Sequence, residues 1–444
     1  MITKEAVLAA VEAEQIRFID LWFTDIMGIV KSVTVPGSDI DHVIENGVSF
    51  DGSSLEGFAR VAESDMVLMP DLSTFAILPW DQPEERTARL ICTVHTPQGE
   101  PFLGDPRAVL IQTLQQAEAM GYSYQTGMEM EFFLFRLDEA NRPVIQGAHD
   151  EASYYDMSTP AARTIRRKML AALVHLGIDV DSTHSEIGYG QHEIDFHYAG
   201  ALASADQVVT ARVALKTVAQ LNDLYCTFMP RPSADMPGSG MHTHQSLHDR
   251  ETGANLFRDP DDEYGLSEIA RYFLAGQLHH ARAMCAVLAP LVNSYKRLGT
   301  SFEAPVYVTW AHINRAALIR VPSVRSGESA HTRIELRCPD PSSNPYLAMA
   351  VMLQAGLDGI QRRMTRVDPL EETLLVQDRS RLRHLEVLPV SLGEALDVLQ
   401  ANETMMSVLG PYISDRYLAA KRQELDDYNQ YVTTWEVERY ISRY

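Results

Sequence analysis

Four short segments of this sequence read as β-strands that carry charged or metal-binding side chains on one face. In a strand, residues two apart point to the same side of the sheet. The segment MEMEFFLF therefore places Glu129 and Glu131 on one side and Met130, Phe132 and Leu134 on the other. Because burial of apolar side chains is favourable, the apolar side must face the core. The two glutamates must then line a surface or a cavity.

The same pattern recurs in GMHTHQSL, TRIELR and HSEIGYGQHEIDF. The polar faces of these segments carry His242, His244, Ser246, Arg333, Glu335, Arg337, Glu186 and Glu193. Any one segment alone could be an exposed strand whose charges face water. If the polar faces converge, however, five glutamates and His242 meet beside several arginines.

Carboxylates brought this close repel one another and raise one another's pKa unless cations lie between them. A bound metal is the simplest source of that positive charge. Ligation dominated by oxygen suits Mg²⁺ or Mn²⁺ better than zinc, and two neighbouring ions are the usual clamp for a transferring phosphoryl group. The pattern therefore predicts a divalent-metal site that serves phosphoryl transfer.

Other catalytic motifs are weak or absent. HEIDFH spaces its histidines five apart, whereas the HExxH helix of a zinc protease spaces them four apart. The sequence contains no Walker A motif, no GxGxxG run and no GxSxG nucleophile elbow. The sequence therefore disfavours both a glycine-rich nucleotide-binding loop of these two kinds and a serine hydrolase.

Charge and cysteine content limit the binding partners and the cellular compartment that we expect for this protein. With 60 acidic and 38 basic residues the formal charge is −22, which disfavours nucleic acid and anionic membranes as partners. The four cysteines form no CxxC pair, so neither a zinc knuckle nor a disulfide framework is indicated. The N-terminus lacks the uninterrupted apolar run of a signal peptide, and no stretch of about 20 apolar residues follows. We therefore expect a cytoplasmic protein without a membrane span.

Hydrophobic periodicity predicts an α+β fold with two domains. QIRFIDLWFTD and IVKSVTVP read as a hairpin, and the Pro- and Gly-rich segment HTPQGEPFLGDPR marks a boundary that we place near residue 103. Beyond it we expect helices at 106–120, 159–176, 204–224, 265–290 and 344–364. Strands are expected at 127–136, 178–198, 241–247, 305–311 and 332–338, with a mostly helical tail after 390.

Taken in order, the motifs resemble those of type I glutamine synthetases along nearly the whole chain. They include FDGSSLEGF, GMEMEFFLF, GQHEIDF, PGSGMHTHQSL, NSYKRL, FEAP, INRAALIRVP and TRIELRCPDPSSNPYLA. The resemblance implies a small N-terminal β-grasp domain (1–103) and a large catalytic domain (104–444) whose antiparallel sheet forms a funnel-shaped active site. It also implies a homo-oligomer, a dodecamer of two hexameric rings, with each active site between neighbouring subunits.

The resemblance also assigns roles to residues at the matching motif positions. Two Mg²⁺ or Mn²⁺ ions would be held, one by Glu131, Glu186 and Glu193 and the other by Glu129, His242 and Glu335. L-Glutamate would be bound by Arg297, Arg337 and the backbone around Gly238. ATP would meet Arg315, Arg320 and Arg333 at its phosphates, with His244 and Ser246 nearby. Ammonium would be held by Asp51 of the partner subunit, Ser54, Tyr154, Glu186 and the flap residue Glu303.

The implied reaction is chemically sensible for these residues. A carboxylate is a poor electrophile, so ATP first phosphorylates the glutamate side chain, and Arg315 and Arg320 stabilise the transferring charge. Ammonia then attacks the γ-glutamyl phosphate and gives glutamine, ADP and phosphate. Asp51 would accept a proton from ammonium, and Glu303 would exclude water.

Two other functions remain open at this stage. One is a γ-glutamyl ligase of the same fold that acts on an organic amine, such as a polyamine, ethanolamine or an alkylamine. The other is a binding protein without activity, which the presence of all six implied metal ligands disfavours.

Several positions depart from the family pattern. Pro237 replaces the usual asparagine before GSGMH, Ser185 replaces the second histidine of His-His-Glu, and GTSF precedes the flap. No tyrosine lies between Tyr346 and Tyr412, so we expect the subtype that is not adenylylated. Arg60 matches an arginine that senses glutamine in the feedback-inhibited subtype, and it could equally be a solvated surface residue.

Overall fold

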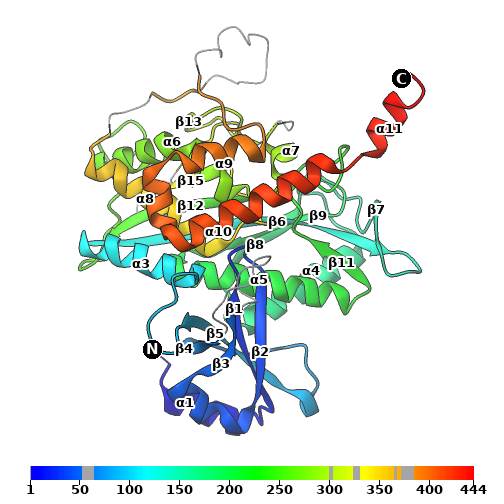
Figure 1. Ribbon diagram of the computed structural model, residues 1–444, viewed down its shortest axis with the longest axis vertical. Helices are drawn as coiled ribbons and strands as arrows, with labels where there is room; N and C mark the ends of the chain where they lie inside the picture. Colours follow the sequence, from blue (N-terminus) through cyan, green and yellow to red (C-terminus); the bar gives the residue numbers. More distant parts are fainter. Residues whose placement is uncertain (1, 53–64, 300–303, 324–330, 365–367, 372–384) are drawn as a thin grey trace.

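The computed structural model describes residues 2–52, 65–299, 304–323, 331–364, 368–371 and 385–444. Ser54, Arg60 and Glu303 therefore lie outside the described residues. Figure 1 shows a small lower domain and a larger upper domain, with the C-terminal helix projecting from the upper one.

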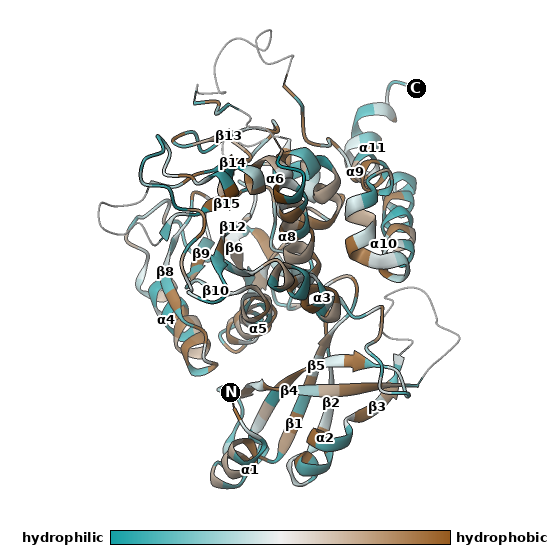
Figure 2. Ribbon diagram, turned by 90° about the vertical axis from the view of Figure 1, so that its left-hand side faces the viewer, coloured by the Kyte–Doolittle hydropathy of each residue, from teal (hydrophilic) through white to brown (hydrophobic). Residues whose placement is uncertain are grey.

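The small domain is a five-stranded sheet in the order β2-β1-β5-β4-β3. Its strands are β1 (Phe18–Thr24), β2 (Val30–Pro36), β3 (Val48–Asp51), β4 (Asp65–Ile77) and β5 (Thr87–His95). Helices α1 (Lys4–Ala13) and α2 (Ile40–Asn46) cover one face, with short 3-10 turns η1 (Gly37–Asp39) and η3 (Pro83–Glu85) between elements. Alternate residues of β1 and β5, such as Leu21 and Leu90, are fully buried between sheet and helices (Figure 2).

The expected hairpin at residues 15–36 is confirmed, because β1 and β2 pair antiparallel along their whole length. Gly28 in its turn has a φ of +83°, which favours glycine. A Cβ added there would also lie 2.9 Å from the Cα of Asn344 in the large domain. Asn344 in turn donates from Nδ2 to the carbonyls of Asp25 and Ile26, at 3.1 and 3.4 Å. The hairpin turn is thus one of the contacts between the two domains.

The large domain contains a ten-stranded sheet whose main path is β13-β14-β15-β12-β6-β9-β8. The central strand is β6 (Tyr122–Leu137), which also pairs with β7 (Pro143–Ala148), β10 (Ala199–Gly200) and β11 (Leu224–Thr227). The others are β8 (Val180–Ser185), β9 (Gln191–Phe196), β12 (Met241–Asp249), β13 (Trp310–Ala311), β14 (Ile319–Arg320) and β15 (Ile334–Leu336).

Several helices of the large domain close one face of this sheet. The helices of this domain are α3 (Pro106–Ala119), α4 (Pro160–His175), α5 (Ala201–Gln220), α6 (Glu268–Leu288), α7 (Ser294–Leu298), α8 (Pro345–Gln361), α9 (Leu392–Gln400), α10 (Glu403–Gln430) and the projecting α11 (Thr434–Tyr440). Figure 2 shows α3, α5, α6 and α8 on one side of the large sheet. The apolar face of β6 packs there, with Met130, Phe132 and Leu134 fully buried. No helix among the described residues has the length and apolar character needed to cross a bilayer.

The α+β class is confirmed, and so is most of the expected element order. One strand was overestimated: of residues 305–311 only Trp310–Ala311 joins the sheet. The backbone of Val306 and Val308 instead pairs with Leu388 and Glu386, at 2.8 Å each, and so leaves the sheet. The link between β5 and α3 spans residues 96–105, so the boundary expected near 103 falls in it and stays a prediction.

Arg107 at the start of α3 ties the domains together by ion pairs. Its Nη2 lies 2.7 Å from Asp71 Oδ2 in the small domain and 2.8 Å from Asp206 Oδ2 on α5. Its Nε also donates to Asp206 Oδ1 at 3.0 Å, and Tyr346 Oη donates to the same oxygen at 2.7 Å. Because Arg107 is buried, removing it would leave the carboxylates of Asp71 and Asp206 without their shared cation.

We expect Arg107→Ala to lower the free energy of unfolding by about 3–5 kcal/mol, the range for breaking a buried ion pair. Thermal and urea unfolding at one fixed protein concentration would measure it. The matched control is Arg86→Ala, which removes an exposed pair with Glu14 and should cost less than about 1 kcal/mol. Equal effects of the two variants would contradict the role of Arg107.

Candidate active site

Strand register brings the polar residues of the large sheet together. Residues directly opposite in an antiparallel ladder share a face, so pairing decides which side chains are neighbours. Glu131 of β6 is paired with Glu193 of β9, and Glu129 of β6 is paired with His242 of β12. On the far side of β12, His244 is paired with Glu335 of β15. The four segments whose polar faces were expected to converge do converge.

One group of side chains surrounds Glu129. His242 Nδ1 lies 3.2 Å from Glu129 Oε2 and 3.6 Å from Glu335 Oε1. His244 Nε2 lies 2.7 Å from Glu129 Oε1. Glu129, His244 and Glu335 can also direct ligand atoms to one point, since those atoms lie within 4.8 Å of one another. This group contains all three residues expected at one metal, with His244 as a further donor.

A second group lies around Glu193. His184 Nε2 is 3.1 Å from Glu193 Oε1, and His184 Nδ1 is 3.5 Å from Glu186 Oε1. His184, Glu193 and Asp195 also offer ligand atoms within 4.8 Å of one another. Neither His184 nor Asp195 was expected to be a ligand, although both lie inside the HSEIGYGQHEIDF motif that pointed to Glu186 and Glu193.

Burial and mutual repulsion raise the pKa of two of these carboxylates, Glu131 and Glu193. Burial raises the pKa of Glu131 to about 7, against the lowering effect of Arg297 and Arg337. Burial, and then the negative charges of Glu131 and Glu129, raise the pKa of Glu193 well above its usual range. Positive charge placed between such groups would relieve both effects.

His242 of the first group has the opposite shift. Burial and the positive charge of Arg337 lower the pKa of His242 to about 4, so its imidazole is neutral at pH 7. A neutral imidazole can donate a lone pair to a metal. With an oxygen-rich donor set and clustered anionic charge, the site therefore fits divalent cations of the Mg²⁺ and Mn²⁺ kind.

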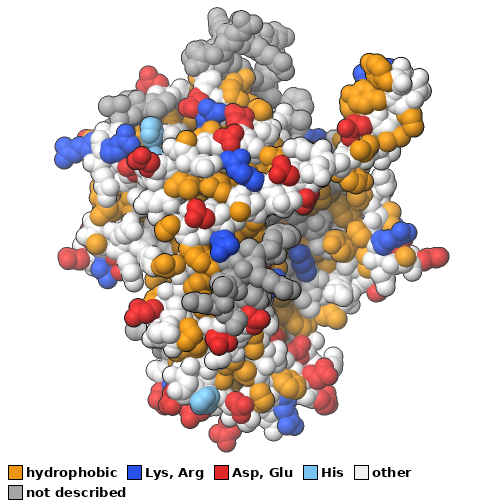
Figure 3. All heavy atoms as spheres, viewed as in Figure 1, with side chains coloured by type: hydrophobic (Ala, Val, Ile, Leu, Met, Phe, Trp, Pro, Cys, Tyr) orange, Lys and Arg blue, Asp and Glu red, His pale blue; other side chains and the backbone are white. Residues whose placement is uncertain are grey.

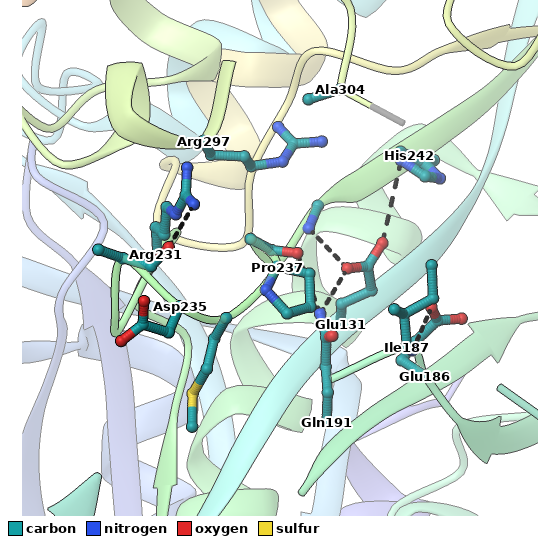
Figure 4. A pocket seen from close by; sticks show the side chains of 14 residues that line it. Glu131, Glu186, Ile187, Gln191, Arg231, Asp235, Pro237, His242, Arg297 and Ala304 are labelled. Carbon is teal, nitrogen blue, oxygen red and sulfur yellow. Dashed lines mark hydrogen bonds and ion pairs between the residues drawn. The ribbon is translucent and has the colours of Figure 1, made fainter. Parts of the chain in front are cut away.

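A cavity of about 290 Å³ lies beside Glu131 (Figure 4). It is lined by the loop 234–238, by Gln191 and by Arg297, and also by Glu186, His242 and Arg231. Gln191 Nε2 donates to Glu131 Oε2 and to the Gly238 carbonyl, both at 3.0 Å, so it joins Glu131 to the loop 234–238. Sequence reasoning missed Gln191, although it stands in the GQHEIDF motif. We call this cavity the glutamate pocket, after the substrate that the sequence motifs imply for Arg297 and Gly238.

Arg297 is held rigidly in this pocket. Its guanidinium donates to the carbonyls of Arg337, Cys338 and Pro339, at 2.9, 2.8 and 3.1 Å. Arg337 is buried and ion-paired with Glu335, and it is not among the residues that line the glutamate pocket. Pro237 lines the pocket where the family pattern has an amide.

A second cavity, of about 690 Å³, opens on the other side of Glu129. It is lined by His244, Ser246 and Arg333, three of the residues expected at the nucleotide, and by Tyr198 and Asn255. Arg333 Nε donates to His244 Nδ1 at 3.2 Å. We call it the nucleotide pocket, after the ligand that the sequence motifs imply for these residues. Arg320 Nε lies 2.5 Å from Glu335 Oε2.

The expected ammonium residues are only partly brought together. Arg315 Nη1 donates to Tyr154 Oη at 3.1 Å, and the Tyr154 ring lies 5.8 Å from that of His184, which contacts Glu186. Asp51 ends β3 at the edge of the small sheet, away from β8 and β9 of the same chain (Figure 2). Ser54 and Glu303 fall outside the described residues.

Ser185 forms a contact that the family pattern did not suggest. Its hydroxyl lies 2.9 Å from that of Ser158, and Arg166 of α4 donates to both hydroxyls, at 2.9 and 2.6 Å. The Ser185 carbonyl accepts the Tyr155 N–H at 3.3 Å. The loop that carries Tyr154 is thus fastened to the residue before Glu186.

Comparison with known proteins decides the family. A model of the glutamine synthetase catalytic domain matches residues 103–440, and a model of the glutamine synthetase β-grasp domain matches residues 15–97. The chain belongs to the glutamine synthetase family. Members of this family depend on ATP and on divalent metal ions, and their substrates are glutamate and ammonia.

Similarity to individual relatives extends over the whole chain. A glutamine synthetase of Methanosarcina mazei is 44% identical over 443 residues, 99% of this chain and 98% of the relative. One of Thermus thermophilus is 44% identical over 449 residues, 100% of this chain and 99% of the relative. Among solved structures, a GmaS/ADP complex is 31% identical with a TM-score of 0.87, covering 100% of both chains. The predicted family membership is confirmed.

Gly240 offers a direct test of the glutamate pocket. A Cβ added there would lie 2.5 Å from Arg297 Nη2 and 3.0 Å from His242 Nε2. We expect Gly240→Ala to raise the KM for glutamate at least about tenfold, which corresponds to about 1.4 kcal/mol of displaced contacts. The control is Gly200→Ala, where no atom lies within 4 Å of the added Cβ. An unchanged KM in Gly240→Ala would show that Arg297 does not act in glutamate binding.

Proposed function

We propose that this chain joins ammonia to the side-chain carboxylate of L-glutamate, using ATP and a γ-glutamyl phosphate, and releases glutamine, ADP and phosphate. The observation that supports it most is the row of carboxylates and histidines made by the register of β6, β9, β12 and β15. This row lies between a pocket of amino-acid size and a larger pocket lined by His244 and Arg333.

We further propose two divalent ions in this row. Glu131, Glu186 and Glu193 would hold one ion, and Glu129, His242 and Glu335 the other. Mg²⁺ or Mn²⁺ bound there would offset the charge of the transferring phosphoryl group. The clustered anionic charge around Glu193 and the neutral imidazole of His242 support the assignment.

The arginines divide between the two substrates in this proposal. Arg297 and Arg337, with the Gly238 backbone, would orient glutamate so that its side chain points to Glu131. Arg315, Arg320 and Arg333 would stabilise the phosphates of ATP, with His244 and Ser246 beside them. Arg320 and Arg337 both contact Glu335, so one buried carboxylate orients an arginine for each substrate.

The acceptor amine would bind near Tyr154 and Glu186. Ammonium is not a nucleophile until it loses a proton, so an anionic group must take that proton. Asp51 is our candidate, with Ser54 and Glu303 completing the site, and Asp51 would come from the partner subunit because its own small domain holds it away. Glu303 would keep water from the acyl phosphate.

Homo-oligomerisation, which we propose as a dodecamer of two hexameric rings, would supply that partner. Exposed apolar side chains support an oligomer: Trp435, Val437, Tyr440 and Ile441 of the C-terminal arm are 43–76% exposed. Figure 3 shows apolar side chains gathered on this projecting arm. Apolar groups concentrated on an arm that projects into water are typical of an interface.

We expect Glu131→Gln to lower kcat by more than about 100-fold, since even outer partners of a metal site contribute about 10- to 100-fold. Mn²⁺ titration followed by electron paramagnetic resonance should show one ion per chain instead of two. The control is Glu118→Gln, whose carboxylate pairs with Arg250 on the surface. Two ions in both variants would refute the assignment of Glu131.

The amine decides between the proposed function and its alternative, a γ-glutamyl ligase for organic amines. That alternative is tested because the GmaS structures are 31% identical to this chain and because Pro237 and Ser185 depart from the family pattern. We expect kcat/KM for ammonia to exceed that for methylamine, ethanolamine and putrescine by at least about 100-fold, because the wrong amine leaves polar groups unpaired.

Phosphate release with each amine, at fixed glutamate and ATP, measures these constants. A Tyr154→Phe variant is a useful companion, because it keeps the ring but loses the hydroxyl that meets Arg315. Equal efficiency with any organic amine would transfer the assignment to the organic-amine ligases.

A further inference from the structure

A third cavity lies between the two domains, away from the residues assigned above. Its volume is about 710 Å³, and its walls come from the β1–β2 turn, α5, the end of β11 and α10. None of its lining residues belongs to the glutamate or nucleotide pocket. We call it the junction pocket.

The junction pocket contains more positive than negative side chains. Its basic residues are Lys31, Arg212, Lys216 and Lys421, and its acidic residues are Asp25 and Glu424. Lys31 Nζ lies 3.5 Å from Asp25, and Lys421 Nζ lies 2.9 Å from Glu424. Both carboxylates also accept hydrogen bonds from the backbone. Asp25 accepts two N–H groups, and Glu424 accepts the N–H of Val292.

The other two basic residues have no such partner. Within the described part of the chain, neither Arg212 nor Lys216 has a carboxylate oxygen within 4.0 Å. Arg212 donates from Nη2 to the Ser343 carbonyl, but its Nε is buried and has no acceptor among the described residues. Burial lowers the pKa of Arg212 to about 10, so the guanidinium is still charged at neutral pH. The negative charge of Asp340 offsets this burial only in part, so an anion in the pocket would stabilise the guanidinium further.

Apolar side chains form the rest of the wall. Met27 and Ile29 of the β1–β2 turn line the cavity from the small domain, and Phe228, Met229 and Leu291 line it from the large domain. Lys216 Nζ lies 5.7 Å from the centre of the Phe228 ring, so positive charge and an aromatic face are presented together. An inorganic anion has no apolar part that could contact these side chains, whereas an organic anion has one.

We infer that the junction pocket binds an organic dianion, a small molecule with an apolar body and two negative charges, through Arg212 and Lys216. A dicarboxylate and a phosphate monoester both have this chemistry. Because the pocket is walled by both domains, a bound dianion would stabilise their contact and raise the temperature of unfolding.

Calorimetric titration of the full-length protein tests this inference without turnover. The probes are phthalate, phenyl phosphate and, as the monoanion, benzoate, and the Lys216 and Arg212 variants described below separate binding in the junction pocket from binding in the active site. We expect phthalate or phenyl phosphate to bind at least about tenfold more tightly than benzoate and to raise the melting temperature. The tighter of the two dianions shows whether carboxylates or a phosphate is preferred.

Variants locate the binding. Lys216→Ala and Arg212→Gln should each weaken dianion binding at least about tenfold, while Arg167→Gln, an exposed arginine on α4, should not change it. Lys216 is exposed and its loss should not disturb folding, so it keeps the test valid if Arg212→Gln is unstable. Absence of binding to the wild-type protein, or unchanged binding in Lys216→Ala, would overturn the inference. Since binding is measured apart from catalysis, the outcome is independent of which amine the enzyme uses.

Discussion

The repulsion among buried carboxylates on one face of β6 is the constraint on which the rest of the structure depends. Glu129 and Glu131 can stay close to Glu193 and Glu335 only because the strands that carry them are fixed from the other side. There, Met130, Phe132 and Leu134 are fully buried against the helices. Burial of each such side chain contributes about 1.5–3 kcal/mol, which helps to hold the carboxylates together against their repulsion. Local hydrogen bonds then orient the carboxylates: Glu131 accepts from the Gly240 N–H and from Gln191.

The sequence was most informative where one strand has two chemically different faces. Alternation in MEMEFFLF was sufficient to predict both the strand and the direction of its glutamates, because a side-chain period of two admits no other arrangement. Most long helices were also located to within a few residues by their apolar spacing. The prediction of a sheet strand at 305–311 was largely wrong, because most of this segment pairs with the chain near residue 387 and not with the sheet. An alternating pattern shows that a segment is extended, but it does not identify the neighbour.

The partners of the site could not be read from local sequence. Register places Glu131 opposite Glu193, 62 positions later, and depends on the geometry of the whole sheet. Arg107 meets Asp71 and Asp206, far away on either side in the chain. His184 and Gln191 lie inside recognised motifs, yet their contacts with Glu193 and Glu131 appear only when the strands are paired. The residues that the motifs suggested as metal ligands lie on neighbouring strands and the loop before β9, whereas Asp51 requires a second subunit in our proposal. The sequence showed that Ser185 stands where the family pattern has histidine, but it did not show that the Ser185 hydroxyl contacts Arg166.

Asn344 has a consequence for how the chain folds. Its Oδ1 accepts the N–H groups of Tyr346 and Leu347 at the start of α8, while its Nδ2 donates to the hairpin turn of the small domain. One amide side chain therefore initiates a core helix and fastens the other domain at the same time. Cooperative folding units are defined by such shared contacts. Separation of the domains would leave the Nδ2 donors without their acceptors and α8 with a disturbed first turn. The two domains should accordingly unfold in one transition, and either one expressed alone would be less stable than its own core suggests.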